Sequence, residues 1–393
     1  MSTSLSPTDA VVIGGARTPI GRAHRGSLID VDPIDLAQTV MAAVVERTGI
    51  DPHELDDIVI AESLHGGGVI GRNAAIRLGW HDVPALADNR HCAAGLSAIQ
   101  IAASSIKAGM DRAVLAGGTE SLSSMPRLLR SIPFSAQDYQ PWAPASHPET
   151  PDAPAFDMSI TVGENTAREV GLSREELDGW ALRSHHNAAH ARDNGLFDDE
   201  IVPVTLPDGS LFTQDEHPRA DTSAEKLANL KVIHPEIDGA VITAGNAAGV
   251  NDGAAATIVT SAEWAEAHGV APVARLIAWA SAGVAPARTG MAPTVAIPKA
   301  LERAGMSVAD IDLWEINEAF CSVPAAAVKV LGIDPEIVNP VGSGCGLGHP
   351  IACTGSRMVV TMINQLRQRN QSIGLVSMCA GGGMGSALIL ELL

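Results

Sequence analysis

The feature that most constrains the fold of this chain is an internal repeat. Residues 46–62 read ERTGIDPHELDDIVIAE, and residues 302–318 read ERAGMSVADIDLWEINE. Each copy is typical of a helix end, a glycine stop, a short acidic turn and an apolar strand. At a constant offset of 256 residues the copies are identical at six positions, which are Glu46/Glu302, Arg47/Arg303, Gly49/Gly305, Asp56/Asp312, Ile60/Ile316 and Glu62/Glu318. Identities at one offset favour duplication over two similar connections that arose by chance.

The segments that follow each copy also correspond, since each contains a reactive side chain, a helix, a strand and a glycine cluster in that order. In the first half these are Cys92, residues 95–107, residues 113–116 and Gly117-Gly118. In the second half they are His349, a helix that reaches about residue 368, residues 374–378 and Gly381-Gly382-Gly383. At the offset of 256, Cys92 falls one residue from His349. The alternation of strand and helix predicts layered α/β domains with covered sheets.

A different segment separates the two halves. Residues 122–249 are rich in proline and poor in regular apolar runs, with an expected amphipathic helix over 174–194 and a turn at Pro207-Asp208-Gly209. A surface insertion without function is one interpretation, but long loops on rigid scaffolds often hold ligands, so we predict a substrate-binding loop domain. The length of 393 residues favours two domains. We predict an N-terminal domain over 1–272, including this insertion, and a C-terminal domain over 273–393.

Composition excludes several classes of function. The formal charge of −19 and the 3% aromatic content argue against a nucleic-acid-binding or anionic membrane-binding protein, but they are compatible with a small anionic ligand. There is no run of about 18 apolar residues, residues 1–10 lack the features of a secretory signal, and the last three residues are not a peroxisomal address. The five cysteines form no CxxC pair, so we expect no zinc site, no disulfide framework and a cytoplasmic location.

Cys92 is the first candidate for catalysis. It stands at the expected N-terminus of a helix, where free N–H groups and the helix dipole favour a thiolate. The alternative is a buried, inert cysteine, which is the commoner fate of a single cysteine. We interpret the preceding His91 as structural, because neighbouring side chains at a helix start point apart.

Three further segments contain candidates. His349 lies in a glycine-flanked turn into a helix, where Pro350 suits the first helical position and the glycines leave room for a ligand. Cys379 precedes three glycines, whose N–H groups are free to bind an oxyanion; a flexible turn is the alternative. Asn317 ends an apolar strand, and a buried Asn either braces a loop or positions a water, whereas we interpret Glu318 as structural.

Taken together, these segments resemble the thiolase family. HCAAGL resembles its nucleophile segment, NEAF its asparagine motif, GHPIACTG its histidine motif, and CAGGGMG its second-cysteine motif. ARTPIGR (16–22), GGTESLSSMP (117–126) and TAGNAAGVNDGAAA (243–256) also look like family landmarks, so the resemblance covers nearly the whole chain. It implies a thiolase-like fold of duplicated, layered α-β-α-β-α domains with an inserted loop domain.

The resemblance also implies a reversible Claisen condensation or thiolysis of 3-ketoacyl-CoA, the activity of an acetyl-CoA C-acetyltransferase or C-acyltransferase. Cys92 would accept the acyl group as a thioester. His349 would take the Cys92 proton and then, with a water held by Asn317, bind the thioester oxygen. Cys379 would move the α-proton of the second acyl-CoA, while the N–H groups of Cys92 and Gly381 would stabilise the other oxyanion, each such donor contributing about 3–4 kcal/mol.

The resemblance further implies contacts with coenzyme A, which is a substrate here, so no tightly bound cofactor or metal is expected. The expected contact residues are Arg219, Ala244, Ala248, Met158 and His234. Several positions depart from the family pattern: Ala94 and Ala248 stand where serine is usual, Ala352 where glycine is usual, Val341-Gly342-Ser343 where Asn-Gly-Gly is usual, His234 where an aromatic residue is usual, and Asp157 where histidine is usual.

Other interpretations remain open from the sequence. A Cys-His-Asn hydrolase would use Cys92, His349 and Asn317 but would leave Cys379 unexplained. A ketoacyl-synthase-like condensing enzyme would have histidine or asparagine in place of Cys379. A non-catalytic acyl-CoA-binding paralogue would account for the altered ligand-side residues. The resemblance implies a role in lipid and fatty acid metabolism, acyl-CoA and CoA as partners, and a homodimer or homotetramer.

Overall fold

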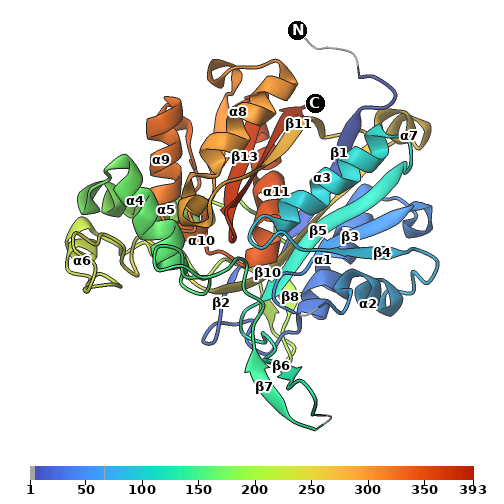
Figure 1. The fold of residues 1–393 in the computed structure, drawn as a ribbon. Coiled ribbons are helices and arrows are strands. Elements are labelled where there is room, and N and C mark those ends of the chain that lie inside the picture. Colours follow the sequence, from blue (N-terminus) through green and yellow to red (C-terminus); the bar gives the residue numbers. More distant parts are fainter. Residues whose placement is uncertain (1–4, 66, 136) are drawn as a thin grey trace.

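The structure is a computed structural model that describes residues 5–65, 67–135 and 137–393. The first four residues of the segment predicted to lack a secretory signal therefore lie outside the described residues. The architecture is a mixed α/β fold in which helices flank and separate the strands of a large sheet (Figure 1). No helix within the described ranges has the length and apolar character needed to cross a membrane.

Both copies of the repeat fold as the sequence predicts. The first contains the end of helix α1 (Pro33–Thr48), the turn η1 (Pro52–Glu54) and strand β3 (Asp57–Ala61). The second contains the end of α8 (Pro293–Ala304), the turn η4 (Val308–Asp310) and β12 (Leu313–Ile316). Gly49 and Gly305 end the two helices with φ values of 68° and 65°, which are left-handed conformations that favour glycine.

The identical residues of the repeat make equivalent hydrogen bonds. A carboxylate oxygen of Asp56 accepts from the backbone N–H groups of residues 112–113 at 2.6 and 3.1 Å. An oxygen of Asp312 accepts from those of residues 372–373 at 3.0 and 2.8 Å. Each aspartate thereby fixes the start of a neighbouring strand, β5 (Ala113–Ser121) or β13 (Ile373–Ala380). These matched contacts support the inferred duplication.

The main sheet has ten strands among the described residues, in the order β12-β13-β14-β11-β1-β10-β5-β3-β4, with β2 beside β10. The strands not yet given are β1 (Ala10–Arg17), β2 (Gly21–Arg22), β4 (Ala85–Asp88), β10 (Asn251–Ser261), β11 (Ala274–Gly283) and β14 (Met384–Leu392). Strands β1 and β11 pair antiparallel, with Val11 opposite Arg275 and Val12 opposite Ala274. The two halves of the sheet, each with the same order of equivalent strands, join at this pair.

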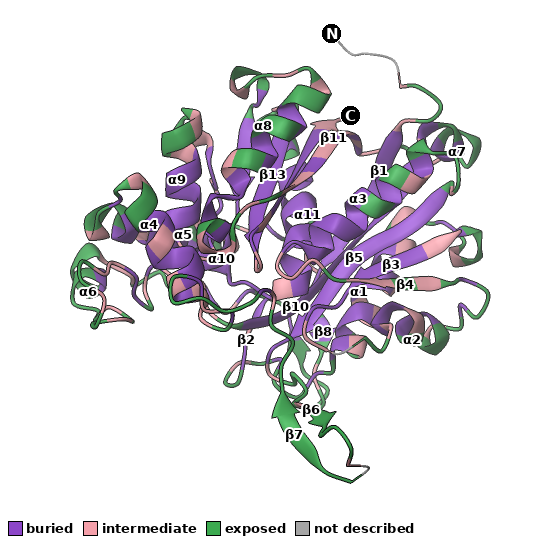
Figure 2. Cartoon of the chain, in the orientation of Figure 1, coloured by how far each residue is buried: buried purple, intermediate pink, exposed green. Residues whose placement is uncertain are grey.

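Two buried helices lie side by side at the centre, between the two halves of the sheet (Figure 2). They are α3 (Ala94–Lys107) and α11 (Ile351–Arg369), and their N-terminal turns cross closely. A Cβ at Gly95 would lie 2.4 Å from the carbonyl oxygen of Ala352, so only glycine fits there. Gly355 is equally close to Leu96, and Gly95 and Gly355 are 260 residues apart. At this offset of 260, four residues longer than the offset of the repeat, Cys92 corresponds to Ala352. The prediction that Cys92 falls one residue from His349 is therefore wrong.

The fold has five layers, which are outer helices, a half-sheet, the central helices, the second half-sheet and outer helices. Three buried apolar clusters hold these layers together. One lies between α1 and α2 (Ile70–Arg77) and the first half-sheet, a second surrounds α3 and α11, and the third lies between the second half-sheet and α8 with α9 (Ser322–Leu331). The remaining elements of the two halves are α7 (Ala262–Ala267), η3 (Pro286–Met291), η5 (Pro335–Ile337) and α10 (Gly344–Leu347). The predicted class, layered duplicated α/β domains with covered sheets, is confirmed.

The glycine clusters differ between the halves. Gly117 and Gly118 lie inside β5, so the prediction that they follow the strand is wrong. A Cβ at Gly117 would be 2.3 Å from the Ala255 carbonyl oxygen, and one at Gly118 would be 2.0 Å from that of Ala352. These glycines allow close approach of neighbouring backbones. In the second half the prediction is confirmed, because residues 381–383 form the turn between β13 and β14.

The segment between the halves occupies the place of that turn. Strand β5 ends at Ser121, the chain returns at Asn251, and Ser121 pairs with Asp252. The segment contains β6 (Leu128–Ser131), β7 (Tyr139–Trp142), η2 (Ser159–Glu164), α4 (Asn165–Val170), α5 (Arg174–Asp193), β8 (Val204–Thr205), β9 (Leu211–Phe212) and α6 (Ala224–Ala228). The predicted helix over 174–194 is α5, and the predicted turn joins β8 to β9.

Candidate active site

Cys92 stands in a tight turn between β4 and α3. The preceding residue, His91, has a φ of 46°, which is a left-handed conformation that costs a non-glycine residue of order 1–3 kcal/mol. The turn is held because His91 donates its N–H to Asn89 Oδ1 at 2.9 Å and accepts from Ser63 Oγ at 2.9 Å. His91 thus has the structural place that the sequence analysis gave it, and it presents Cys92 at the start of the central helix.

The two halves bring both sulfurs together. The Gly381 backbone N–H lies close enough to the Cys92 sulfur to lower the pKa of the thiol, so the turn after β13 lies beside the start of α3. Cys379 lies two residues before Gly381 and is buried, and the neighbouring Cys92 contributes to its raised pKa. Cys92, Cys379 and Gly381 therefore form one cluster, although they are far apart in the sequence.

The thiols are less acidic than expected. Burial raises the pKa of Cys92 to about 11, although the hydrogen bond from Gly381 acts in the opposite direction. Burial and the adjacent Cys92 raise the pKa of Cys379 well above its ordinary range. The expectation that the helix N-terminus favours a Cys92 thiolate is therefore wrong for the free protein, because burial outweighs the backbone N–H groups of Gly381 and Cys92 that lower the pKa. Ionisation of either sulfur requires a base or a bound substrate.

His349 lies just before α11, with Pro350 at the N-cap position and not at the predicted first helical position. The His349 backbone N–H donates to Asn251 Oδ1 at 3.0 Å. Its Nδ1 lies 2.7 Å from Thr354 Oγ1, while Nε2 is buried without a hydrogen-bond partner among the described residues. Burial, and then the positive charge of Arg357, lower the pKa of His349 to about 3. The imidazole is therefore neutral and has a free nitrogen.

Asn317 follows β12 directly and is fully buried. Its backbone N–H donates to Ser377 on β13, two residues before Cys379, so the ends of both strands lie side by side. Neither side-chain polar atom of Asn317 has a partner among the described residues. A buried amide of this kind requires a hydrogen-bonding partner, such as a substrate atom or a water. The position agrees with the functional interpretation of Asn317.

Glu318 has the structural role that the sequence predicts. It accepts hydrogen bonds from Ser184, Asn339 and the backbone N–H groups of residues 343 and 345. These contacts connect α5 of the inserted segment to the loop before His349. Burial raises the pKa of the Glu318 carboxyl despite these donors. The carboxyl is fully engaged and is not a free catalytic group.

The segment that contains Ala244 and Ala248 runs beside the catalytic loops. Ala248 donates its N–H to the Ala319 carbonyl oxygen at 2.9 Å, and Val250 forms a bridge with His349. Ala248 is half-buried, and Ala244 is exposed. The structure thus brings Ala248 next to the loop of Asn317 and near His349, whereas Ala244 lies further along the same segment.

Two of the departures from the family pattern contact each other. His234 Nε2 lies 3.2 Å from Asp157 Oδ2 and 2.7 Å from Ser159 Oγ, and its Nδ1 lies 2.8 Å from Glu236 Oε1. Burial lowers the pKa of His234, but the bond to Glu236 and the charge of Asp157 outweigh it and raise the pKa. Met158, beside Asp157, packs against the apolar cluster that contains Cys379.

Arg219 lies exposed in a group of arginines. Burial, and then the charge of Arg219, lower the pKa of Arg22; the carboxylate of Glu216 opposes them, and Arg25 and Arg192 lower it further. The group therefore concentrates positive charge in a chain whose formal charge is −19. Sequence reasoning missed Arg22, Arg25 and Arg192, because they belong to different segments.

Sequence reasoning also missed Thr354, Asn251 and Ser159. Each contacts a predicted site residue, but a lone Thr, Asn or Ser gives no signal of its own. Thr354 and Asn251 do lie inside two of the quoted motifs, GHPIACTG and TAGNAAGVNDGAAA, but the motifs alone did not indicate which residue contacts His349.

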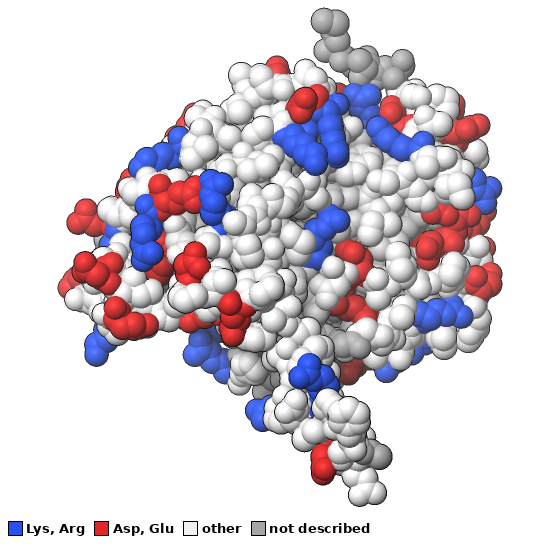
Figure 3. Space-filling view, viewed as in Figure 1, with Lys and Arg blue, Asp and Glu red and all other residues white. Residues whose placement is uncertain are grey.

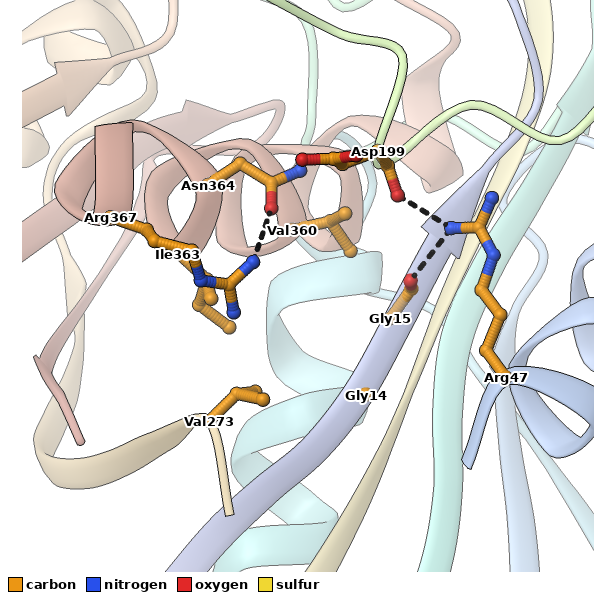
Figure 4. A pocket seen from close by; sticks show the side chains of 9 residues that line it. All are labelled: Gly14, Gly15, Arg47, Asp199, Val273, Val360, Ile363, Asn364 and Arg367. Carbon is orange, nitrogen blue, oxygen red and sulfur yellow. Dashed lines mark hydrogen bonds between the residues drawn. The ribbon is translucent and has the colours of Figure 1, made fainter. Parts of the chain in front are cut away.

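A cavity elsewhere contains none of the predicted site residues. It measures about 160 Å³ and is lined by Gly14, Gly15, Arg47, Asp199, Val273, Val360, Ile363, Asn364 and Arg367 (Figure 4). Arg47 donates there to the backbone carbonyl oxygens of Gly15 and Asp199, at 3.3 and 2.8 Å, so it braces the chain. Within the described ranges, no group of three or more His, Cys, Asp or Glu side chains could hold a metal ion.

Comparisons with known proteins cover the whole chain. The thiolase N-terminal domain family matches residues 10–263, and the thiolase C-terminal domain family matches residues 270–392. The chain is 38% identical to a 3-ketoacyl-CoA thiolase of Bacillus subtilis and 39% identical to an acetyl-CoA acetyltransferase of Escherichia coli; each alignment covers 98% of this chain and 99% of the relative.

Two solved structures are similar throughout. The crystal structure of the Bacillus anthracis acetyl-CoA acetyltransferase has a TM-score of 0.90 and 40% identity, covering 98% of this chain and 99% of that one. Human mitochondrial 3-ketoacyl-CoA thiolase has a TM-score of 0.89 and 31% identity, covering 98% of this chain and 100% of that one.

Proposed function

Because this chain belongs to the thiolase family and is a thiolase-type acyltransferase, we propose that it condenses two acyl-CoA molecules, or cleaves a 3-ketoacyl-CoA with CoA, through an acyl group on Cys92. The observation that supports this most directly is the proximity of the Gly381 N–H to the Cys92 sulfur, where it lowers the pKa of the thiol. A donor from the second half of the molecule therefore lies beside the sulfur that would carry the acyl group.

In the first step, the Cys92 sulfur attacks the thioester carbonyl of an acyl-CoA. His349 takes the thiol proton and returns it to the leaving CoA sulfur, so that a new thioester forms as the old one breaks. The free Nε2 of His349 supports this role, because its lone pair can accept a proton. The low pKa of the imidazole in the free protein opposes the transfer, so the imidazolium must be stabilised by the thiolate that forms beside it. The unpartnered amide of Asn317 supports binding of the thioester oxygen through a water.

In the second step, Cys379 gives its own proton to a base such as His349, and the resulting thiolate removes an α-proton from a second acyl-CoA. The carbanion attacks the acyl group on Cys92, the bond from the acyl carbon to the Cys92 sulfur breaks, and that sulfur takes up the proton that Cys379 released. A thiolate adjacent to another sulfur is a strong base, and the raised pKa of Cys379 supports proton abstraction from carbon. The N–H groups of Gly381 and Cys92 would stabilise the oxyanion that forms on the acyl carbon, at about 3–4 kcal/mol for each donor. Thiolysis is the same sequence in reverse.

Coenzyme A is proposed to bind along the segment that contains Ala244 and Ala248, with its anionic nucleotide end near Arg219. The arginines around Arg219 support this orientation because they favour phosphate groups. Met158 and His234 are proposed to contact the pantetheine arm or acyl group. The ion pair between His234 and Asp157 makes this side of the site more polar than an aromatic residue would.

We also propose that the enzyme acts in lipid and fatty acid metabolism in the cytoplasm, with CoA thioesters as substrates and no tightly bound cofactor. A reducing compartment is supported by the five free cysteines, two of which the mechanism needs as thiols. The domain division at residues 272 and 273 is supported by its position between α7 and β11.

A homodimer or homotetramer is supported by the hairpin of β6 and β7, which projects from the body of the protein (Figures 1 and 2). It is exposed and carries few charges in Figure 3, and its large exposed apolar side chains are Leu129, Ile132, Phe134, Tyr139 and Trp142. An exposed apolar surface of this kind marks a protein contact. Light scattering of the wild type and of a Leu129→Asp, Phe134→Asp variant tests the proposal, which predicts a smaller assembly for the variant.

The central experiment is thiolysis of short, long and branched 3-ketoacyl-CoAs by the purified enzyme. We expect CoA-dependent cleavage of at least one class, and the preferred class identifies the acyl pocket. Labelling with iodoacetamide and peptide mass mapping should modify Cys92, and acyl-CoA should protect it. Hydrolysis without CoA dependence would favour the hydrolase interpretation, and modification of other cysteines alone would contradict the role of Cys92.

A further inference from the structure

The His349 imidazole makes one side-chain hydrogen bond among the described residues, and its partner is Thr354. His349 Nδ1 lies 2.7 Å from Thr354 Oγ1, which also lies 2.8 Å from the carbonyl oxygen of Pro350. Thr354 is completely buried and His349 nearly so; Thr354 lies in the first turn of α11, and His349 lies just before this helix. The hydroxyl is therefore shared between a carbonyl oxygen and an imidazole nitrogen in a site sheltered from solvent.

The available protons determine which tautomer His349 adopts. A hydroxyl group has one proton, and a carbonyl oxygen only accepts. When Thr354 donates to Pro350, its oxygen accepts from a proton on His349 Nδ1, and all three groups are satisfied. The opposite arrangement would place the imidazole proton on Nε2, which has no acceptor among the described residues. An unpaired buried donor costs about 1–3 kcal/mol, so the Nδ1–H tautomer is favoured.

The surroundings fix the position of His349 and keep its imidazole neutral. Its backbone is fixed by the hydrogen bond from its N–H to Asn251. Burial and the charge of Arg357 lower its pKa to about 3, so the imidazole is neutral over the working range of pH. Burial raises the pKa of the Cys92 thiol to about 11, so the nucleophile needs a base at neutral pH. A free lone pair on His349 Nε2 is what such a base requires.

We propose that Thr354 is a positioning residue, which orients the His349 imidazole and fixes its proton on Nδ1, so that Nε2 takes the Cys92 proton. This inference rests on the proposed function of His349. The proton moves from the Cys92 sulfur to Nε2, the sulfur–carbon bond to the acyl group forms, the bond to the CoA sulfur breaks, and the Nε2 proton leaves with CoA. Throughout, the Nδ1–H stays bonded to Thr354, as a carboxylate holds the histidine in a serine hydrolase.

The test compares Thr354→Val, which keeps the shape but removes the hydroxyl, with Thr354→Ser, which keeps the hydroxyl. Thr361→Val is a matched control, because Thr361 is also buried on α11 and donates to Glu200, not to His349. The readouts are kcat and KM for thiolysis of a preferred 3-ketoacyl-CoA, and the rate of iodoacetamide modification of Cys92 as a function of pH.

At about pH 7 we expect Thr354→Val to lower kcat and the modification rate by about tenfold to a hundredfold, part of the effect of a general base, with little change in KM. Thr354→Ser and Thr361→Val should stay within about threefold of the wild type. At about pH 10 the modification rates of the wild type and Thr354→Val should converge, because hydroxide then ionises the Cys92 thiol directly.

The inference would be overturned if Cys92 in Thr354→Val reacted with iodoacetamide at the wild-type rate at neutral pH. Equal losses of rate in the Val and Ser variants, or a loss that is the same at every pH, would also overturn it. These outcomes would leave thiolysis by the wild type intact and would concern Thr354 alone. Absence of thiolysis in the wild type, or wild-type modification of Cys92 in His349→Ala, would instead overturn the proposed function on which the inference rests.

Discussion

The two halves of the molecule share the residues that hold the fold and differ at the residues proposed for catalysis. Asp56 and Asp312 fix equivalent strands, Gly49 and Gly305 end equivalent helices, and Gly95 and Gly355 cross at the centre. In contrast, the positions equivalent to the catalytic candidates hold different residues in the other half. The pairs are Cys92 and Ala352, Asn89 and His349, Thr119 and Cys379, and Ala61 and Asn317.

This difference shows what each half contributes. The duplication supplies two helices whose N-termini meet and two strands that end beside them, which places side chains from both halves in one site. The proposed chemistry needs a nucleophile, a base and a second thiol with distinct roles, so identical halves would not be sufficient. The halves therefore share the residues that fix the helices and strands, and they differ where the helix N-termini and strand ends meet.

The largest expected effects come from two single variants, each of which removes the proposed catalytic sulfur of one half. Cys92→Ala should lower thiolysis by at least about 10⁴-fold, because the covalent step is lost. Cys379→Ala should lower condensation by about 10²–10⁴-fold but leave acylation of Cys92 within a few-fold, because it acts only on the second substrate. Mass spectrometry of the acylated protein and a condensation assay separate the steps.

Cys353→Ala is the control for this pair, since Cys353 is buried on α11 and outside the proposed chemistry. An equal loss of acylation and condensation in Cys379→Ala would mean that Cys379 supports the structure, and the two sulfurs would not have separate roles.

A smaller effect is expected at the donor from the second half. Gly381→Pro removes the N–H that reaches Cys92 and should lower kcat by about 10²–10³-fold. Gly381→Ala keeps the N–H, and its Cβ would meet His91 and Ser146 no closer than 3.8 Å, so activity should fall only slightly. Similar rates for both variants would show that this N–H does not act on the reacting group.

The inserted segment and the second half each contain a buried histidine that should make stability depend on pH. Burial first lowers the pKa of His217 in the insertion and of His349 to about 3. Because these values lie below the ordinary value of about 6.5, the unfolded chain binds more protons than the folded protein between about pH 3 and pH 6.5. The stability that neutral histidines contribute is complete above about pH 6.5 and falls with pH, by up to about 1.4 kcal/mol per unit for each.

The thermal midpoint measured from about pH 7 to pH 4 should therefore fall, and less steeply in His217→Gln than in the wild type. His81→Gln, at an exposed position, is the matched control. A slope unchanged in His217→Gln would show that this histidine is not buried in its neutral form.

The smallest effect is expected at the matched aspartates. Asp56→Ala and Asp312→Ala each remove an acceptor for two backbone N–H groups, at an expected cost of about 1–2 kcal/mol, with kcat unchanged. Thermal unfolding of the single and double variants should give similar and additive losses. A much larger loss at one aspartate would show that the two supports are not equivalent.

Much of the fold could be predicted from local patterns. The repeat of 46–62 and 302–318 predicted its helix ends, turns and strands because glycine stops, acidic turns and apolar runs are local signals. The bounds of α5 followed in the same way, since Ser173 and Glu176 form a capping box. The catalytic candidates could be named from the sequence because each lies in a distinctive motif next to such an element.

The rest depends on contacts between distant segments. Gly117 and Gly118 resemble a turn in sequence, and only the approach of Ala255 and Ala352 shows why glycine stands inside a strand. The acidity of Cys92 depends on how deeply the assembled fold buries it. The contact between Asp157 and His234, which lie 77 residues apart, is likewise invisible in either segment alone.

The place of the inserted segment has a consequence for how such enzymes diversify. It leaves and re-enters between hydrogen-bonded neighbours, since Ser121 pairs with Asp252. The two ends therefore stay fixed whatever lies between them, and lengthening a loop adds only about 0.6 kcal/mol of closure entropy per doubling. The outer parts of the segment can therefore change in length without moving the strand ends, whereas α5 is constrained because Ser184 bonds to Glu318 beside the candidate site.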